Sequence, residues 1–291
     1  MTHESLTNPP CLLCYGNLTV DDVVLPDGTE MLGCIGGDAL YATLAARAFD
    51  PTAQPVAPLG CNIDPSLISA MSNVGLSMAG MCKRDSPTLH NRVVYDNFGG
   101  REWTVYNDAM DFSILSPVIS DIPPSWLTAA RHLILAMDLD ATTALVENLC
   151  PNPQQIVAFD PQEDYIYKHE EQLLEIIKAV DIFMPSEEEV FRLLGHRNWS
   201  QAARFLSSIG PSLVIVKRGE SGVLLYDRDR GLEFHIPVHP RAKNAHQDIL
   251  DVTGAGDTFC GAFMAALNTN SPEIAALAGC TAASFTVMGY G

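Results

Sequence analysis

The chain has few basic residues. Lys and Arg number 17 against 35 Asp and Glu, so the formal net charge is −18 over 291 residues. A surface with this excess of negative charge repels the phosphate backbone of nucleic acids and the headgroups of anionic lipids. We therefore expect no nucleic-acid partner and no membrane docking. Hydrophobic residues make up 47% of the chain and charged residues 18%, which is typical of a folded protein and excludes a disordered one.

Long hydrophobic runs are also missing. No apolar stretch approaches the roughly 20 residues that a membrane-spanning helix needs. Residues 1–10 lack the basic region and apolar core of a secretory signal. The eight cysteines are spread from Cys11 to Cys280, which favours free thiols in a reducing, cytoplasmic location. Cys11 and Cys14 have CxxC spacing, but without a second pair or a nearby histidine a metal or redox role is disfavoured.

Two common phosphate-binding signatures are absent as well. No Gly-Lys dipeptide occurs, which excludes a Walker A loop. The segment from Gly254 to Phe259 lacks the third glycine of a dinucleotide fingerprint, and too little chain follows it for a βαβ unit. We therefore do not expect a dehydrogenase.

Short apolar runs alternate with helical patterns from about residue 131 onward. Strands that are apolar along their whole length are buried on both faces, so this alternation predicts an α/β fold with a mainly parallel sheet covered by helices on both sides. The predicted strands are Cys11–Tyr15, Arg131–Asp138, Gln155–Asp160, Val180–Met184, Ser212–Lys217 and Gly222–Tyr226, and the predicted helices are Ala141–Leu149, His169–Ala179, Glu187–Leu194 and Gln201–Ile209.

The segment Asn91–Asn107 has a different pattern. Two β-rich runs, Arg92–Tyr95 and Trp103–Tyr106, are separated by a stretch that contains Gly and Asn, which supply the positive φ of a hairpin turn. The hairpin is either a surface feature of the main domain or a small β lid over a site at the strand ends. The sequence leaves both interpretations open.

A glycine-rich turn precedes a long apolar helical pattern that ends at Leu267. In this turn, Gly254-Ala255-Gly256, several backbone N–H groups point outward with the positive end of the helix dipole behind them, which favours phosphate binding. Asp257 follows directly and would compete with a phosphate for these N–H groups. A carboxylate here suits a base that takes a proton from a hydroxyl attacking a phosphoryl group. The alternative is that Asp257 only caps the helix.

Near the N-terminus, an aspartate and a glycine pair could form a second part of a site. Asp21 follows the first predicted strand and could accept paired hydrogen bonds from vicinal hydroxyls. Gly36-Gly37 opens an alanine-rich helical pattern and would let the backbone approach the same small ligand. Taken singly, such residues more often belong to turns and tight connections.

Two further segments each allow two interpretations. Ser186 and Glu189 have the spacing of a capping box at a helix start, or Glu189 acts in the outer shell of a Mg²⁺ ion. Lys217, Gly219 and Gly222 lie between two predicted strands, either in a simple hairpin turn or in a loop that shapes a nucleotide pocket.

Taken together and in this order, the motifs resemble those of the ribokinase-like (PfkB) family of carbohydrate and nucleoside kinases. Asp251–Asp257 matches the family's C-terminal signature nearly residue for residue, and Gly36-Gly37 matches its N-terminal signature region. The resemblance implies a ribokinase-like three-layer α/β/α sandwich, as a single domain over residues 1–291. It also implies a small β lid contributed by about residues 12–35 and 88–110, which favours the sugar and nucleoside branch over the vitamin kinases.

The resemblance assigns a role to each candidate residue. For catalysis, it implies that Asp257 is the base and that an anion hole is formed by Gly254, Ala255 and Gly256. For substrate binding, it implies that the acceptor is bound by Asp21, Gly36, Gly37 and Tyr41, and the nucleotide by Ser186, Lys217, Gly219 and Gly222. For the cations, it implies that Glu189 binds Mg²⁺ through water and that Asp251 and Thr253 bind K⁺.

Two positions depart from the family pattern. Ser186 replaces the usual Asn beside the metal, and Tyr41 stands where ribokinases proper have Asn, which counts against ribose as the acceptor. The expected function is transfer of the γ-phosphoryl group of ATP, with Mg²⁺ and also K⁺ as cations, to a hydroxyl of a small sugar, sugar acid or inositol-like polyol. The alternatives are a nucleoside kinase and a catalytically weak ligand-binding member. A homodimer through the lid is the candidate assembly.

Overall fold

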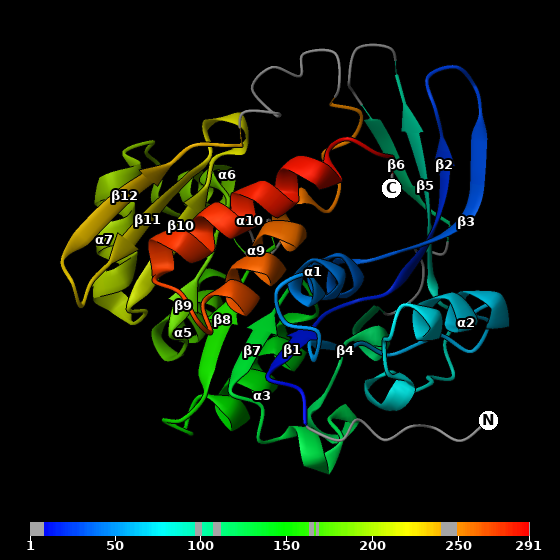
Figure 1. The fold of residues 1–291 in the computed structure, drawn as a ribbon, viewed down its shortest axis with the longest axis horizontal. Helices are drawn as coiled ribbons and strands as arrows, with labels where there is room; N and C mark the ends of the chain where they lie inside the picture. The colour runs from blue at the N-terminus through cyan, green and yellow to red at the C-terminus, as the bar shows by residue number, and fades with distance from the viewer. Residues whose placement is uncertain are drawn as a thin grey trace.

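The computed structural model of the protein describes residues 9–96, 101–106, 112–162, 166, 169–239 and 249–290. The strands of its large sheet are β1 (Leu12–Tyr15), β4 (Gln54–Val56), β7 (Arg131–Ile134), β8 (Ile156–Phe159), β9 (Ile182–Phe183), β10 (Leu213–Lys217), β11 (Val223–Asp227) and β12 (Leu232–Ile236). Their order is β12-β11-β10-β9-β8-β7-β1-β4 (Figure 1). The strands from β10 to β4 run parallel, and β11 and β12 are antiparallel additions at one edge.

Helices cover both faces of this sheet. On one face, in front of the sheet in Figure 1, lie α1 (Asp38–Arg47), α9 (Ala255–Ala266) and α10 (Pro272–Thr286). On the other lie α3 (Leu139–Leu149), α5 (Glu170–Ala179), α6 (Glu187–Leu194) and α7 (Trp199–Ile209). The predicted three-layer α/β/α sandwich with a mainly parallel sheet is thus confirmed. A further α-helix is α2 (Pro65–Asn73). The short 3₁₀ helices, labelled η, are η1 (Met78–Gly80), η2 (Phe112–Leu115), η3 (Ile119–Asp121), η4 (Pro124–Trp126) and η5 (Gly219–Ser221).

The apolar strands supply two cores because alternate side chains point to opposite faces of a sheet. In β1, Leu13 and Tyr15 join one buried cluster, and Leu12 and Cys14 join the cluster on the other face. All four residues have no exposed surface. This burial on both sides is the physical reason that the strands are apolar along their whole length.

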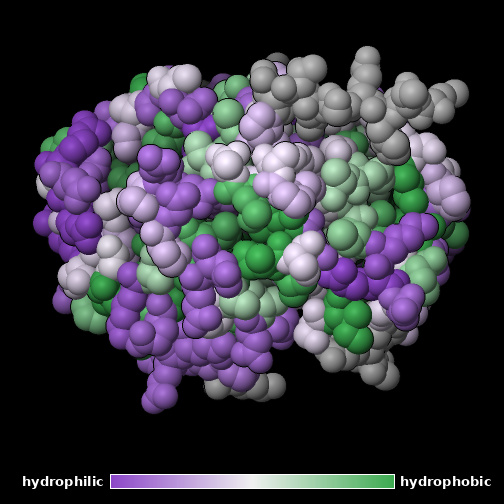
Figure 2. All heavy atoms as spheres, turned by 90° about the horizontal axis from the view of Figure 1, so that it is seen from below, coloured by the Kyte–Doolittle hydropathy of each residue, from purple (hydrophilic) through white to green (hydrophobic). Residues whose placement is uncertain are grey.

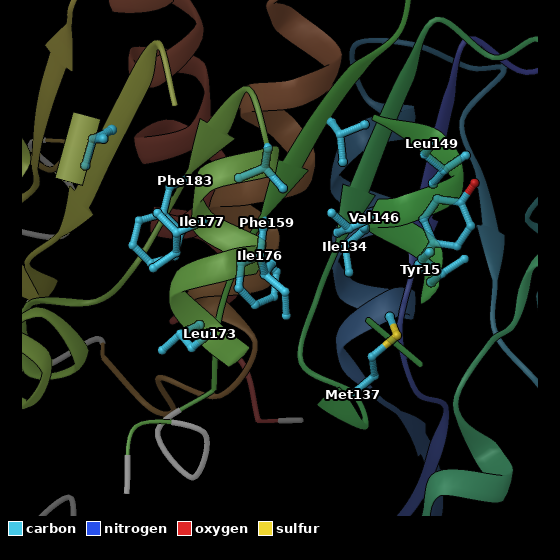
Figure 3. Packing of buried hydrophobic residues seen from close by; sticks show 14 of the residues in the cluster. Tyr15, Ile134, Met137, Val146, Leu149, Phe159, Leu173, Ile176, Ile177 and Phe183 are labelled. Atoms are coloured by element: carbon cyan, nitrogen blue, oxygen red, sulfur yellow. The ribbon is translucent and has the colours of Figure 1, made fainter. Parts of the chain in front are cut away.

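Figure 3 shows part of the first of these clusters. Phe159 and Phe183, from adjacent strands, stack with their ring centroids 6.0 Å apart, and Ile176 and Ile177 of α5 lie beside them. The 3.6-residue spacing of apolar side chains in α5 therefore serves to bury one side of that helix against the sheet.

Some predicted boundaries differ from the structure. The predicted strand Arg131–Asp138 ends at Ile134, because Asp138 is the N-cap of α3 and its carboxylate accepts the backbone N–H of Ala141. The predicted helix Gln201–Ile209 begins two residues earlier, at Trp199, where the side chain of Asn198 caps the first turn. In both cases a side-chain cap sets the helix start.

A second, four-stranded sheet lies beside the large one, at the right of Figure 1. It has the order β3-β2-β5-β6, built from β2 (Thr19–Val24), β3 (Glu30–Gly36), β5 (Leu89–Tyr95) and β6 (Arg101–Val105). The predicted hairpin is the antiparallel pair β5–β6, although residues 97–100 and 107–111 lie outside the described residues. The lid was expected from about residue 12, but β1 belongs to the large sheet because its apolar side chains are buried there on both faces.

One face of the molecule carries both polar and apolar areas (Figure 2). Figure 2 shows one face on which hydrophilic residues cover most of the left and lower parts and hydrophobic residues gather near the centre. Within the described ranges no helix combines the length and apolar character needed to cross a membrane. The eight cysteines, Cys11 and Cys14 included, are free thiols in the structure.

The burial of the central strands gives a prediction for stability. Replacing Leu133, which has no exposed surface on β7, with alanine should lower the free energy of unfolding by about 2–5 kcal/mol, since it leaves a cavity in a packed core. The matched control Leu127→Ala, at a side chain that is 42% exposed, should change it by no more than about 0.5 kcal/mol. Urea unfolding monitored by circular dichroism measures both, and equal losses would contradict this description of the core.

Candidate active site

Polar side chains collect at the carboxyl edge of the parallel strands. Asp160 directly follows β8, Ser186 follows β9 and Lys217 ends β10. Asn17 follows β1, and its side-chain Nδ2 donates to the carbonyl oxygen of Ala136 beyond β7 at 2.9 Å. β1 has β4 as its neighbour on one side and β7 on the other, so the strand order reverses direction at β1. In open α/β sheets such a point at the carboxyl edge is the usual place for a ligand.

The start of α9 provides the anion-binding geometry that the glycine-rich turn predicted. Gly254 is its N-cap, with a left-handed φ of 71°, and no side chain among the described residues caps this helix. The first N–H groups of a helix have no partner inside it, so they are available to an anion. A Cβ on Gly254 would lie 2.6–2.8 Å from the ring of Tyr41, and therefore only glycine fits there.

Asp257 lies within this first turn and not at the cap position, which belongs to Gly254. Burial raises the pKa of Asp257 to about 6, and the negative charge of Asp160 adds to the shift while Lys217 opposes it. A carboxylate with this pKa can accept a proton near neutral pH. The interpretation of Asp257 as only a helix cap is disfavoured, because a different residue occupies the cap.

A buried ion pair joins the strand ends to this helix. Nζ of Lys217 lies 2.5 Å from Oδ1 of Asp160, and the thiol of Cys260 donates to Oδ2 of the same carboxylate at 3.2 Å. The ammonium also lies 3.4 Å from the point where a Cβ of Gly256 would stand. Burial alone would lower the pKa of Lys217, but Asp160 raises it well above its ordinary value. Lys217 is therefore a permanent positive charge beside the anion-binding turn.

Two cavities meet at Lys217. One of about 500 Å³ is lined by the predicted nucleotide residues Ser186, Lys217, Gly219 and Gly222 together with Ala255 and Gly256. The other, of about 370 Å³, is lined by Asp160, Gln162, Glu189, Lys217 and Asp257. The structure thus brings the predicted nucleotide residues, two anion-hole residues, the predicted base and the predicted metal residue into one continuous region.

Both interpretations of Ser186 and Glu189 find support. The backbone N–H of Ser186 donates to Oε2 of Glu189 at 2.6 Å, and the N–H of Glu189 donates to Oγ of Ser186 at 3.2 Å, which is a complete capping box. Glu189 is also buried, and burial raises its pKa to about 7, although the charge of Lys217 opposes the shift. The carboxylate therefore caps α6 and faces the smaller cavity at the same time.

The donor set of the smaller cavity fits a Mg²⁺ ion. The carboxylates of Asp160, Glu189 and Asp257 line it, and carboxylate oxygen is the ligand type that Mg²⁺ prefers. No group of three or more His, Cys, Asp or Glu in the described part of the chain could hold a metal by itself. These side chains therefore suit an ion that keeps most of its ligands from phosphate and water.

The predicted acceptor residue Asp21 lies on the small sheet. Its Oδ1 accepts from Nδ2 of Asn91 at 2.7 Å, and its Oδ2 accepts from Oγ1 of Thr19 at 3.0 Å. Burial raises the pKa of Asp21, while these two hydrogen bonds lower it. A Cβ on Gly36 would stand 2.1 Å from Oδ2 of Asp21, so a glycine at this position is what gives the carboxylate its place.

The remaining predicted residues link the small sheet to the glycine-rich turn. The backbone N–H and the hydroxyl of Thr253 donate to Oδ1 of Asp251 at 2.8 and 2.7 Å. The hydroxyl of Tyr95, on β5, lies 3.3 Å from Oγ1 of Thr253. Tyr41 packs against Gly254 from α1, and Gly37 is the N-cap of α1. The turn is thus in contact with the small sheet.

Three residues of this region were not predicted from the sequence: Asp160, Asp38 and Asn91. Asp160 follows a predicted strand at its carboxyl end, a position that could have indicated it. Oδ1 of Asp38 accepts the N–H groups of Asn17 and Ala39, both at 2.6 Å, and burial together with the charge of Asp257 raises its pKa well above the ordinary value. Nothing local in the sequence indicates Asn91, because its pairing with Asp21 depends on the register of two distant strands.

Comparison with known proteins identifies the family. Residues 104–291 match the model of the pfkB family of carbohydrate kinases. The chain belongs to this family. It is therefore a phosphotransferase that acts on a hydroxyl group, as predicted. A cytidine kinase from Thermococcus kodakarensis is 29% identical over 90% of this chain and 90% of its own.

Solved structures of other kinases share the fold. A putative ribokinase II from E. coli, in complex with ATP and Mg²⁺, superposes with a TM-score of 0.78 at 20% identity, covering 97% of this chain and 94% of its own. A nucleoside kinase from Burkholderia thailandensis, in complex with inosine, has a TM-score of 0.75 at 16% identity and covers 96% and 92%. At these identities the likeness shows the fold alone.

The raised pKa of Asp257 predicts how activity depends on pH. A base works only when deprotonated, so kcat/KM should rise about tenfold per pH unit below pH 6 and level off above about pH 7. Asp257→Asn should lower kcat/KM by at least about 100-fold and abolish this rise. ADP release measured from pH 5 to 8 tests both, and a wild-type profile that is flat between pH 5 and 7 would contradict the role of Asp257.

Proposed function

We propose that the protein is a Mg²⁺-dependent kinase that transfers the γ-phosphoryl group of ATP to a hydroxyl of a nucleoside. The observation that carries the proposal is the partly buried carboxylate of Asp257 in the uncapped first turn of α9, beside the ammonium of Lys217. The names of two relatives, a cytidine kinase and a nucleoside kinase in complex with inosine, support the choice of acceptor.

The reaction follows from this geometry. The attacking hydroxyl gives its proton to Asp257 while its oxygen forms a bond to the γ-phosphorus, and the bond from that phosphorus to the bridging oxygen of ADP breaks. The N–H groups at the start of α9 and the ammonium of Lys217 stabilise the charge on the transferring group. Mg²⁺, when bound, neutralises charge on the phosphates. Ser186, Gly219 and Gly222, which line the larger cavity, bind the nucleotide.

The acceptor is held on the other side, by the small sheet. An ionised carboxylate offers about four lone-pair sites, and Asp21 uses two of them for Asn91 and Thr19. Two sites remain for a pair of vicinal hydroxyls such as those of ribose. Gly36, Gly37 and Tyr41 complete the acceptor site in this proposal, with the small sheet as its lid and residues 1–291 as one kinase domain.

A free sugar, sugar acid or polyol is the second candidate acceptor. The carboxylate of Asp21 suits any vicinal diol, so it favours a free sugar, sugar acid or polyol as much as it favours a nucleoside. The larger aromatic side chain of Tyr41, in place of the smaller Asn of ribokinases, disfavours free ribose. A member that only binds a ligand is disfavoured by the raised pKa of Asp257, which suits a base.

The proposal has three further parts. Asp251 and Thr253, adjacent to the phosphate-binding turn, are proposed to bind K⁺. A homodimer through the lid is supported by the exposure of Leu32 and Trp103, whose side chains are 65% and 45% accessible. A cytoplasmic location agrees with eight free cysteines.

An acceptor panel tests the proposed function. ADP formation from Mg-ATP is measured with cytidine, inosine, adenosine, ribose and myo-inositol, for the wild type and for Asp257→Asn. At least one nucleoside should stimulate ADP release by about 100-fold over the variant. Stimulation by a sugar or polyol alone would support the second candidate. No stimulation by any acceptor would contradict the kinase function.

The double role of Glu189 gives a prediction for metal dependence. Glu189→Gln keeps an oxygen that can accept the N–H of Ser186, so the capping box and the thermal stability should be retained. The Mg²⁺ concentration for half-maximal velocity should rise about 10- to 100-fold, because the carboxylate no longer orients the ion's water ligands. The matched control is Glu187→Gln, in the same helical turn. Equal effects of both substitutions would contradict a metal role for Glu189.

A further inference from the structure

Asn91 is the neighbour of Asp21 across two parallel strands. The register of β2 and β5 places the two residues side by side, and Asn91 is 1% exposed. Its Nδ2 donates to Oδ1 of Asp21 at 2.7 Å. The other oxygen of Asp21 accepts from Thr19, so the carboxylate acts as an acceptor on both sides. Because the carboxylate of Asp21 accepts hydrogen bonds, the side-chain atom of Asn91 that points to it must be the amide nitrogen Nδ2, and this fixes the orientation of the amide.

This orientation leaves the amide oxygen of Asn91 without a donor. Oδ1 is buried, and within the described part of the chain it has no hydrogen-bond partner. Buried side-chain acceptors are nearly always paired, so an unpaired one beside the proposed acceptor residue Asp21 requires an explanation, and a donor from a bound ligand supplies one.

The side of the small sheet that carries Asn91 faces the phosphate-binding turn. Side chains alternate along β5, so Asn91, Val93 and Tyr95 share one side. Tyr95 reaches Oγ1 of Thr253, one residue before the N-cap of α9. Asn91 therefore lies on the same side of the sheet as Tyr95, which contacts the turn before α9.

We propose that Asn91 is a specificity-determining residue, whose Oδ1 accepts a hydrogen bond from a secondary hydroxyl of the acceptor sugar. This inference rests on the proposed function. The free lone pairs of Asp21 and Oδ1 of Asn91 are acceptors that lie side by side, so they favour a ligand with two adjacent donors, which is what a vicinal diol presents. A deoxy analogue lacks the hydroxyl that would donate this hydrogen bond and would leave Oδ1 of Asn91 unpaired, so the site rejects deoxy analogues.

A cycle of variants and acceptors tests the proposal. We would measure kcat/KM of the wild type and of Asn91→Ala with cytidine, 2′-deoxycytidine and 3′-deoxycytidine. Asn91→Ala should lower the value for cytidine about 10- to 100-fold. For the deoxy analogue that lacks the hydroxyl bound by Asn91, the same substitution should change it less than about threefold, since that hydrogen bond is already absent.

Two controls separate this role from a structural one. Arg92→Ala removes the next side chain, on the opposite side of β5, and should leave all three values within about threefold. Asn91→Ser keeps a small acceptor and should fall between the wild type and Asn91→Ala for cytidine only. An equal loss with all three acceptors would overturn the proposal, as would no loss with cytidine. A loss present with cytidine and absent with uridine would also overturn it, because the donor would then be on the base.

The wild type alone provides an independent measurement if the variants do not fold. It should bind cytidine at least about 10-fold more tightly than the analogue that lacks the recognised hydroxyl, and equal binding of all three would refute the role of Asn91. If the wild type phosphorylates no nucleoside but does phosphorylate a sugar, the proposed acceptor class fails. The role of Asn91 is then judged by the same comparison between that sugar and its deoxy forms.

Discussion

The buried ion pair between Lys217 and Asp160 is the interaction on which the site depends. In the proposed function, a chain with a net charge of −18 binds a polyanion close to the carboxylates of Asp160, Glu189 and Asp257. Uniform surface attraction cannot achieve this, so the attraction has to be local. Lys217 supplies it beside the N–H groups of α9, and Asp160 keeps that ammonium charged despite its burial. A bound Mg²⁺ ion would add positive charge at the same place, so we expect a strong Mg²⁺ dependence from the charge of the chain.

Only the local part of this site could be predicted from the sequence. Asp257 and the turn from Gly254 to Gly256 are contiguous, so their residue types and spacing already specify a helix start with available N–H groups. The α/β fold was predictable for a similar reason, since burial on both faces leaves strands such as β1 apolar throughout. The predicted strand ends were less accurate. A helix cap such as Asp138, which accepts the N–H group three residues later, can start a helix inside a segment that the apolar pattern assigns to a strand.

Contacts between distant segments were not predictable in this way. Asn91 meets Asp21 only because β5 runs parallel to β2 in one register, and a shift of one residue would turn its side chain to the opposite face. Asp160 lies 57 residues before Lys217 and pairs with it because β8, β9 and β10 are adjacent. No local sequence pattern indicates that Asn91 pairs with Asp21 or that Lys217 pairs with Asp160. The rule that ligands bind at strand ends would have indicated Asp160 as a site residue.

The turn before α9 connects the two halves of the site. The donors for phosphate lie on its helix side, while Thr253 meets Tyr95 of the small sheet and Gly254 meets Tyr41 of α1. Asn91 lies four residues before Tyr95 on β5, and Asp21 lies opposite Asn91 on the adjacent strand β2 of the same small sheet. A displacement of the small sheet would therefore change the positions of the proposed acceptor residues and of the turn before α9 together. In the proposed mechanism, the position of the acceptor and the alignment of the phosphoryl group therefore depend on the same contacts, and we expect less transfer to water when no acceptor is in place.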